Sequence, residues 1–108
     1  YADNNSCAVS CTGHGEYFIR HAVAFDVCAR YKYLKESVEI AADYIIHTEL
    51  NTNAGNGGLI AVDKLGNIAM PYNSGGMFRG YLYKERDSSD VKKGYGIGKK
   101  LVVADFIK

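Results

Sequence analysis

The spacing of apolar residues predicts a long helix near the start of the chain. Between residues 16 and about 33, Ile19, Val23 and Val27 recur every four positions and line one face of a helix. Glu16 lies in the first turn, where the helix dipole favours an acidic side chain. Cys28 falls in the middle of this helix, and we expect it to be part of the core.

A second amphipathic run predicts another helix from residue 38 to about residue 50. Ser37 precedes it and is suited to be its N-cap, although Ile40 stands where a capping box would have Glu or Gln. The apolar stripe of this helix consists of Val38, Ala41, Ala42, Ile45 and Ile46. Because the connector, residues 33–36, is short, we expect the two helices to pack as neighbours.

Outside the helices, the pattern changes to the shorter period of strands. Strands are expected at residues 7–11, 59–63, 68–70, 77–83 and 101–107. Residues 51–58 form a loop in this prediction, and the polar residues 85–100 an exposed excursion. The order of strand, two helices and antiparallel strands indicates an α+β fold with helices on one face of a sheet. Upstream sequence or a partner has to cover the other face, so we expect the 108 residues alone to expose apolar surface.

Composition and charge narrow the class of protein. The chain has 108 residues, enough for one domain or part of one, with 47% hydrophobic and 23% charged residues. Thirteen basic and 12 acidic side chains leave a formal net charge of +1, which gives no reason to expect a nucleic acid or a membrane as partner. No apolar run is long enough to span a bilayer.

The cysteines are three in number, so they cannot all pair within the chain. Cys7 and Cys11 lie four residues apart on an expected strand, which separates their Cα atoms by about 13 Å. A disulfide requires less than about 7 Å. We therefore favour a reducing compartment and a cytoplasmic location.

A glycine-spaced turn, Thr12, Gly13, His14 and Gly15, joins the first strand to the first helix. Glycines let the backbone approach a ligand closely, and the first N–H groups of a helix have no partner within it. The Thr12 hydroxyl adds a further donor, so the turn could hold an anion or an oxyanion that forms during a reaction. On the glycines alone, a turn that serves only the fold is the simpler interpretation.

Other kinds of site fit the chain less well. The three histidines, His14, His21 and His47, have no further ligands at metal-binding spacing, and we expect neither a metal nor a cofactor. Ser10 and Cys11 have no recognisable base for nucleophilic catalysis. The turn has neither the phosphate-loop nor the dinucleotide-binding spacing.

Two tyrosines, Tyr81 and Tyr83, are expected on one face of a strand. Since the chain carries almost no net charge, we interpret them as packing residues and not as a platform for nucleic-acid bases.

Four segments in the same order resemble the β subunit of the isoaspartyl peptidase/L-asparaginase family, the plant-type asparaginases. They are residues 7–20 (CAVSCTGHGEYFIR), 41–47 (AADYIIH), 57–63 (GGLIAVD) and 70–80 (MPYNSGGMFRG). The resemblance implies an N-terminal nucleophile hydrolase with an αββα sandwich, activated by self-cleavage into α and β subunits. It also implies a dimer of αβ heterodimers.

The resemblance implies roles for the glycine-spaced turn. The Thr12 hydroxyl and the Gly13 N–H would form an oxyanion hole, the Gly15 carbonyl would hold the substrate's α-amino group, and His14 would line the substrate site. The resemblance further implies that an N-terminal threonine would attack the side-chain amide of L-asparagine or the isopeptide bond of a β-aspartyl dipeptide, with its own amine as base. The glycosylasparaginases are a related alternative.

The family's catalytic threonine has no counterpart here, and residues 84–108 extend past the usual end of the family. We therefore interpret residues 1–108 as a single partial domain, the C-terminal part of a β subunit, inactive by itself. Its expected partners are a small-molecule substrate and the α subunit of the same precursor. A non-catalytic fragment that binds an amino acid is the alternative from another class.

Overall fold

The computed structural model describes residues 1–20, 22–50, 55–84, 89, 91–97 and 102–103. The chain divides into two compact units, Tyr1–Ser74 and Gly75–Lys108. The elements of the first unit are β1 (Cys7–Gly13), α1 (Gly15–Arg20), α2 (Val23–Tyr33), α3 (Val38–Tyr44), the π-helix η1 (Ile45–Leu50), β2 (Gly57–Asp63) and β3 (Ile68–Ala69). Those of the second unit are β4 (Phe78–Lys84), β5 (Val91–Ile97) and β6 (Val102–Val103).

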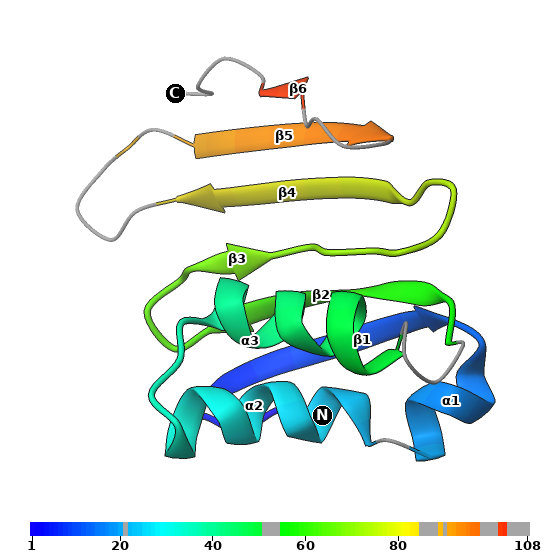
Figure 1. Ribbon diagram of the computed structural model, residues 1–108. Coiled ribbons are helices and arrows are strands. Elements are labelled where there is room, and N and C mark those ends of the chain that lie inside the picture. Colours follow the sequence, from blue (N-terminus) through cyan, green and yellow to red (C-terminus); the bar gives the residue numbers. More distant parts are fainter. Residues whose placement is uncertain (21, 51–54, 85–88, 90, 98–101, 104–108) are drawn as a thin grey trace. The chain divides into compact units, whose positions relative to one another are not determined.

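The first unit is an antiparallel sheet, in the order β1-β2-β3, with its helices packed on one face (Figure 1). The register of β1 and β2 runs from Cys7 opposite Asp63 to Gly13 opposite Gly57. Alternate residues of β1 are buried because successive side chains point to opposite faces of the sheet. The helices add their apolar stripes to this buried face. The core consists of Cys7, Val9, Val23, Val27, Cys28, Val38, Ala41, Ala42, Ile45, Ile46, Leu50, Leu59, Ala61 and Ala69.

The prediction of one long first helix is wrong, because the chain breaks between α1 and α2. Ala22 has left-handed backbone angles, φ 46° and ψ 48°, which interrupt the helical hydrogen bonding. Val23 and Val27 are buried as expected, but Ile19 precedes the break and is 82% exposed. No proline or glycine between residues 16 and 33 marks this position, so the sequence pattern did not predict it.

The second helix follows its prediction closely. The Ser37 side chain caps α3 by accepting a hydrogen bond of 3.2 Å from the Ile40 N–H. The whole predicted apolar stripe, from Val38 to Ile46, lies in the core. The last six residues adopt the wider π-helical form, which the spacing does not distinguish from an α-helix.

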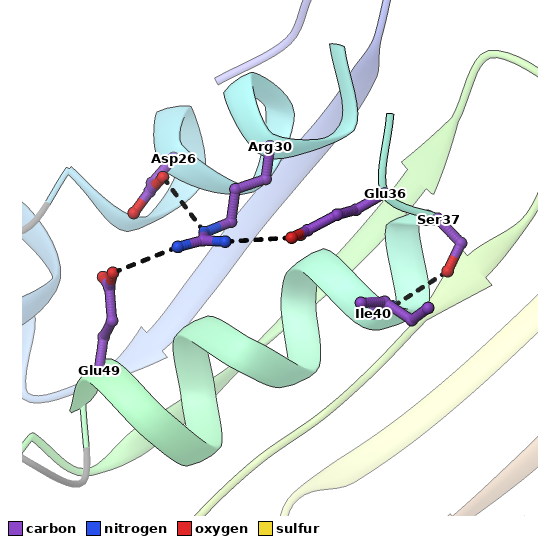
Figure 2. A network of polar contacts seen from close by, with 6 residues as sticks. All are labelled: Asp26, Arg30, Glu36, Ser37, Ile40 and Glu49. Carbon is purple, nitrogen blue, oxygen red and sulfur yellow. Dashed lines mark hydrogen bonds and ion pairs between the residues drawn. The ribbon is translucent and has the colours of Figure 1, made fainter. Parts of the chain in front are cut away.

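Arg30 connects α2 to α3 and η1. Figure 2 shows its guanidinium directed at the carboxylates of Asp26, Glu36 and Glu49. The N···O distances of these ion pairs are 3.7, 3.2 and 3.6 Å, respectively. The guanidinium also lies over the Tyr44 ring, 3.8 Å from the centroid. This network is consistent with the short connector and confirms that the two helical segments pack as neighbours.

A disulfide joins Cys7 of β1 to Cys28 of α2, and their Cα atoms are 5.5 Å apart. Cys7 and Cys11, whose spacing along a strand excludes a bond between them, are not bonded to each other. Cys28 is buried as expected, but its sulfur is bonded to a residue 21 positions earlier in the chain. The cysteine count therefore no longer favours a reducing compartment.

In the second unit, β4 pairs with β5 and β5 with β6, all antiparallel. The prediction of an exposed excursion over residues 85–100 is wrong for β5, which lies within it and pairs with β4 along seven residues. Residues 85–88, 90 and 98–100 lie outside the described residues, as do all of the last predicted strand except β6.

Tyr81 and Tyr83 share one face of β4 with ring centroids 5.9 Å apart, as predicted. A Cβ built on Gly94 of β5 would overlap the Tyr81 ring, so the absent side chain of this glycine is what lets the tyrosine pack across the strand pair.

The fold class is α+β, as expected, although the strands form two three-stranded sheets. Ile60 and Val62 of β2 are 50% and 47% exposed on the face without helices. The expected apolar sheet surface is therefore present. Within the described residues, no helix has the length and apolarity needed to cross a membrane.

Candidate functional site

The glycine-spaced turn lies at the exposed end of the β1–β2 pair. Thr12 and Gly13 are the last residues of β1, His14 follows, and Gly15 begins α1. All four residues are exposed. The structure thus places the four predicted site residues together at one end of the sheet.

Gly13 occupies a position that only glycine can take without strain. Its φ of 131° is in a region that other residues rarely adopt. A Cβ at this position would also collide with the Asn56 carbonyl oxygen and with the Cα of Gly57. Gly13 is therefore required both for its backbone angle and for close packing against β2.

The hydrogen-bond pattern of β1 shows which way the Gly13 N–H points. The N–H and carbonyl of Val9 both pair with Tyr1, on the edge of β1 away from β2. In an antiparallel ladder this direction alternates with each residue, so Cys11 and Gly13 face the same edge as Val9. The Gly57 N–H and carbonyl likewise pair with Asn73 and not with Gly13. The Gly13 N–H consequently points outward from the ladder.

The neighbouring N–H of His14 has a different environment. It donates a hydrogen bond of 2.9 Å to the Asn56 carbonyl, so the loop before β2 uses this donor. The His14 carbonyl accepts from the Tyr17 N–H at 3.0 Å in the first turn of α1, and the two rings lie 6.1 Å apart. Of these two successive N–H groups, that of His14 is hydrogen-bonded to Asn56, whereas that of Gly13 points away from β2.

Thr12 lies on the sheet face that the helices leave uncovered. Exposed residues of β1 alternate with buried ones, and Thr12 shares its face with Ala8 and Ser10. Its partner across the ladder is Gly58, which has no side chain to crowd the hydroxyl. The Thr12 side chain is therefore accessible next to the Gly13 backbone.

The helix after the turn is shorter than the sequence predicts. Because α1 ends at Arg20, the turn does not begin an uninterrupted 18-residue helix with the dipole that such a length would give. The donor chemistry of the site therefore rests on the individual N–H groups and the Thr12 hydroxyl.

Cys11, His21 and His47 were not predicted as site residues. Cys11 of β1 is half-buried against the core on the face that the helices cover. Burial raises the pKa of its thiol, which disfavours the reactive thiolate. His47 lies on η1 beside Asp43, 3.6 Å away, and His21 lies outside the described residues. Where the structure is described, no three side chains of His, Cys, Asp or Glu come together as a metal site would need.

Asn56, whose carbonyl accepts the His14 N–H, was not predicted from the sequence as part of the site. Every residue type has a backbone carbonyl, so the sequence cannot identify which one contacts the turn. The glycine pair at positions 57 and 58 is the sequence feature that suggests a close approach of the two strands there.

Comparisons with known proteins bear on the whole first unit. A family model described as Asparaginase matches residues 1–91. The chain is 48% identical over 83 residues to an isoaspartyl peptidase of Salmonella typhimurium and 46% identical over 83 residues to one of Escherichia coli. Each match covers 77% of this chain and 26% of the relative. A putative isoaspartyl peptidase/L-asparaginase of Dictyostelium discoideum is 42% identical over 92 residues, 82% of this chain and 26% of that protein. The chain spans about a quarter of the length of these relatives.

Proposed function

Since the chain belongs to the asparaginase family, we propose that it supplies part of the active site of an amide-bond hydrolase. The proposed substrates are L-asparagine, cleaved at its side-chain amide, and β-aspartyl dipeptides, cleaved at the isopeptide bond. The observation that carries the proposal is the outward Gly13 N–H beside an accessible Thr12 hydroxyl, inside the region that the family model matches.

In this proposal, Thr12 and Gly13 stabilise negative charge on the carbonyl oxygen of the substrate. A nucleophile adds to the carbonyl carbon, the C=O electron pair moves to oxygen, and the two donors bind the resulting oxyanion. The tetrahedral intermediate then collapses and expels ammonia or the amine of the dipeptide. Water hydrolyses the remaining acyl-enzyme ester and releases aspartate.

The nucleophile in this proposal is an N-terminal threonine carried by a segment outside the 108 residues. Its own amine acts as the base, and self-cleavage of a precursor into α and β subunits exposes it. The length of the relatives supports this division, since each match covers only 26% of the relative. The Gly15 carbonyl and His14 contribute to the substrate site from this chain.

The exposed apolar face of the first sheet supports the proposed architecture. Ile60 and Val62 lie on the same face as Thr12 and have no helical cover. A second sheet packed on this face would bury them and complete an αββα sandwich, with the proposed oxyanion donors at its end.

The proposal is tested with the full-length protein and the variant Thr12→Val, which removes the hydroxyl and preserves the shape of the side chain. Loss of an oxyanion donor costs about 3–4 kcal/mol of transition-state stabilisation, so kcat should fall roughly a hundred- to a thousandfold. Release of ammonia from L-asparagine and of aspartate from a β-aspartyl dipeptide measures the effect.

The matched control is Ser10→Ala, two residues earlier on the same exposed face of β1, which should leave kcat within about twofold. A wild-type protein that binds aspartate or asparagine without releasing either product would favour the non-catalytic alternative. Full activity in Thr12→Val would contradict the role of its hydroxyl.

A further inference from the structure

The Asn73 side chain holds the loop that faces the glycine-spaced turn. Its Oδ1 accepts a hydrogen bond of 2.7 Å from the Gly57 N–H, and its Nδ2 donates to the Gly55 carbonyl at 3.0 Å. The same Nδ2 donates to the Ile46 carbonyl of η1 at 3.3 Å. The Asn73 backbone N–H donates to the Gly57 carbonyl at 2.9 Å. Together with the hydrogen bond of 2.7 Å from the Gly55 N–H to the Leu50 carbonyl, Asn73 fixes the path of residues 55–57 relative to η1.

The loop held in this way is the one that contacts Gly13. The Asn56 carbonyl accepts the His14 N–H at 2.9 Å, and both this carbonyl and the Gly57 Cα lie against Gly13. Asn73 is therefore connected to the turn through a single segment of three residues. A shift of residues 55–57 would move the partner of His14 and the surface against which Gly13 rests.

An amide is the side chain that this position requires. Asn73 uses its oxygen as an acceptor and its nitrogen as a donor to two carbonyls, and an amide group offers both functions at once. A carboxylate in the same place would face the Gly55 and Ile46 carbonyls with no proton to donate. An alanine would leave all three backbone groups without this partner.

We propose that Asn73 is a positioning residue for the oxyanion donor, which it places through residues 55–57 without contacting the substrate. This inference rests on the proposed function, because it assigns Asn73 a part in the same reaction. The oxyanion exists only in the transition state and the tetrahedral intermediate. Misplacing its donor therefore lowers kcat more than it raises KM.

The test uses Asn73→Ala and Asn73→Asp in the full-length protein, with Asn67→Ala as the matched control. Asn67 is also an amide in a loop flanking this sheet, and its Nδ2 donates to the Asp63 carboxylate at 2.8 Å, at the opposite end of β2. Both Asn73 variants should lower kcat about 10- to 100-fold with KM changed less than about threefold. Asn67→Ala should lower the Tm while kcat stays within about twofold.

Hydrogen exchange of the His14 amide tests the positioning step without any substrate. Its exchange should accelerate in both Asn73 variants and remain unchanged in Asn67→Ala, since Asn73 bonds to the acceptor segment whereas Asn67 bonds to Asp63 at the other end of β2. Unchanged kcat and unchanged His14 exchange in the folded Asn73→Asp variant would overturn the inference. A wild-type protein inactive on both substrates would instead refute the proposed function, and the His14 amide would still report whether Asn73 holds the loop.

Discussion

The two ends of the β1–β2 pair are built from the same ladder but are closed in different ways. One end lies at the turn that joins β2 to β3, and we call it the hairpin end. There Cys7 lies opposite Asp63, both residues are buried, and the Asp63 carboxylate accepts hydrogen bonds from N–H groups of the turn. At the other end, which we call the glycine end, Gly13 lies opposite Gly57. Gly13 and the residues that follow it, His14 and Gly15, are exposed. The partner that holds Gly57 there, Asn73, is 16 positions away in the chain.

The difference indicates how one sheet can serve both stability and chemistry. The hairpin end uses its polar groups locally and is crossed by the disulfide from Cys7 to Cys28. At the glycine end, the His14 N–H donates to the Asn56 carbonyl, but the Gly13 N–H points away from the ladder. Changes at the hairpin end should therefore affect folding alone, whereas changes at the glycine end should also affect the reaction.

The substitution with the largest expected effect is Gly13→Ala. An alanine at φ 131° costs about 1–3 kcal/mol of backbone strain, and its Cβ collides with the Asn56 carbonyl, which adds about 1–3 kcal/mol. We expect the free energy of unfolding to fall by about 2–6 kcal/mol and turnover to be lost. Urea denaturation and product release measure the two effects.

Gly66→Ala at the hairpin end separates the strain from the collision. Gly66 has φ 89°, but a Cβ there meets nothing within 4 Å, so only the strain of about 1–3 kcal/mol applies. Its kcat should remain that of the wild type. Equal losses of stability in the two variants would mean that the close packing of Gly13 on residues 56 and 57 contributes nothing.

Sequence patterns predicted the parts of the fold that follow from local periodicity. The Ser37 cap and the buried stripe from Val38 to Ile46 depend on residues a few positions apart, and both were correct. The break at Ala22 was missed because it depends on a single left-handed residue with no glycine or proline to mark it. Strand β5 was missed because glycine and lysine are common in loops and rare in strands, and its strand conformation depends on pairing with β4.

In the candidate site, too, the local sequence predicted the position of the turn but not the contacts with distant residues. The turn from Thr12 to Gly15 could be selected from the sequence because two glycines and a hydroxyl stand at a strand-to-helix junction. The direction of the Gly13 N–H could not, since it follows from the pairing of Val9 with Tyr1 and of Gly57 with Asn73. These contacts join residues that are 8 and 16 positions apart, and no local pattern encodes them.

Removal of the disulfide at the hairpin end is expected to have the second largest effect on stability. Closing a loop of 21 residues stabilises a protein by about 3 kcal/mol in the chain-entropy description, so Cys7→Ala with Cys28→Ala should lose about that amount. Because the bond lies away from the glycine end, kcat should not change. Cys11→Ala, which removes the unpaired cysteine, is the control and should cost about 1 kcal/mol or less.

The disulfide itself can be checked by mapping tryptic peptides without reductant. Trypsin cuts after Arg20 and Arg30, so Cys7 and Cys28 fall in different peptides, and the bond should join them while Cys11 is alkylated. Two separate peptides with all three cysteines alkylated would contradict the bond and restore the argument for a reducing compartment.

Among the three principal changes, Asp63→Ala, which removes the carboxylate that closes the hairpin end, is expected to cost the least stability. Asp63 accepts hydrogen bonds from the Leu65 N–H at 2.9 Å, the Asn67 N–H at 2.8 Å and the Asn67 side chain at 2.8 Å. Their loss should lower the free energy of unfolding by about 2 kcal/mol, because the Asn67 amide and the turn lose a charged partner. Thermal denaturation and the kcat of the same preparation measure whether the effect is confined to stability.

The control for Asp63 is Asp43→Ala on α3, where the carboxylate is 68% exposed and lies 3.6 Å from the His47 Nε2. An exposed pair of this kind contributes less than about 1 kcal/mol, so this variant should unfold within about 0.5 kcal/mol of the wild type. If Asp63→Ala lowered kcat as strongly as Asn73→Ala, the hairpin end and the glycine end would be coupled along β2. The separation of stability from chemistry between the two ends would then be wrong.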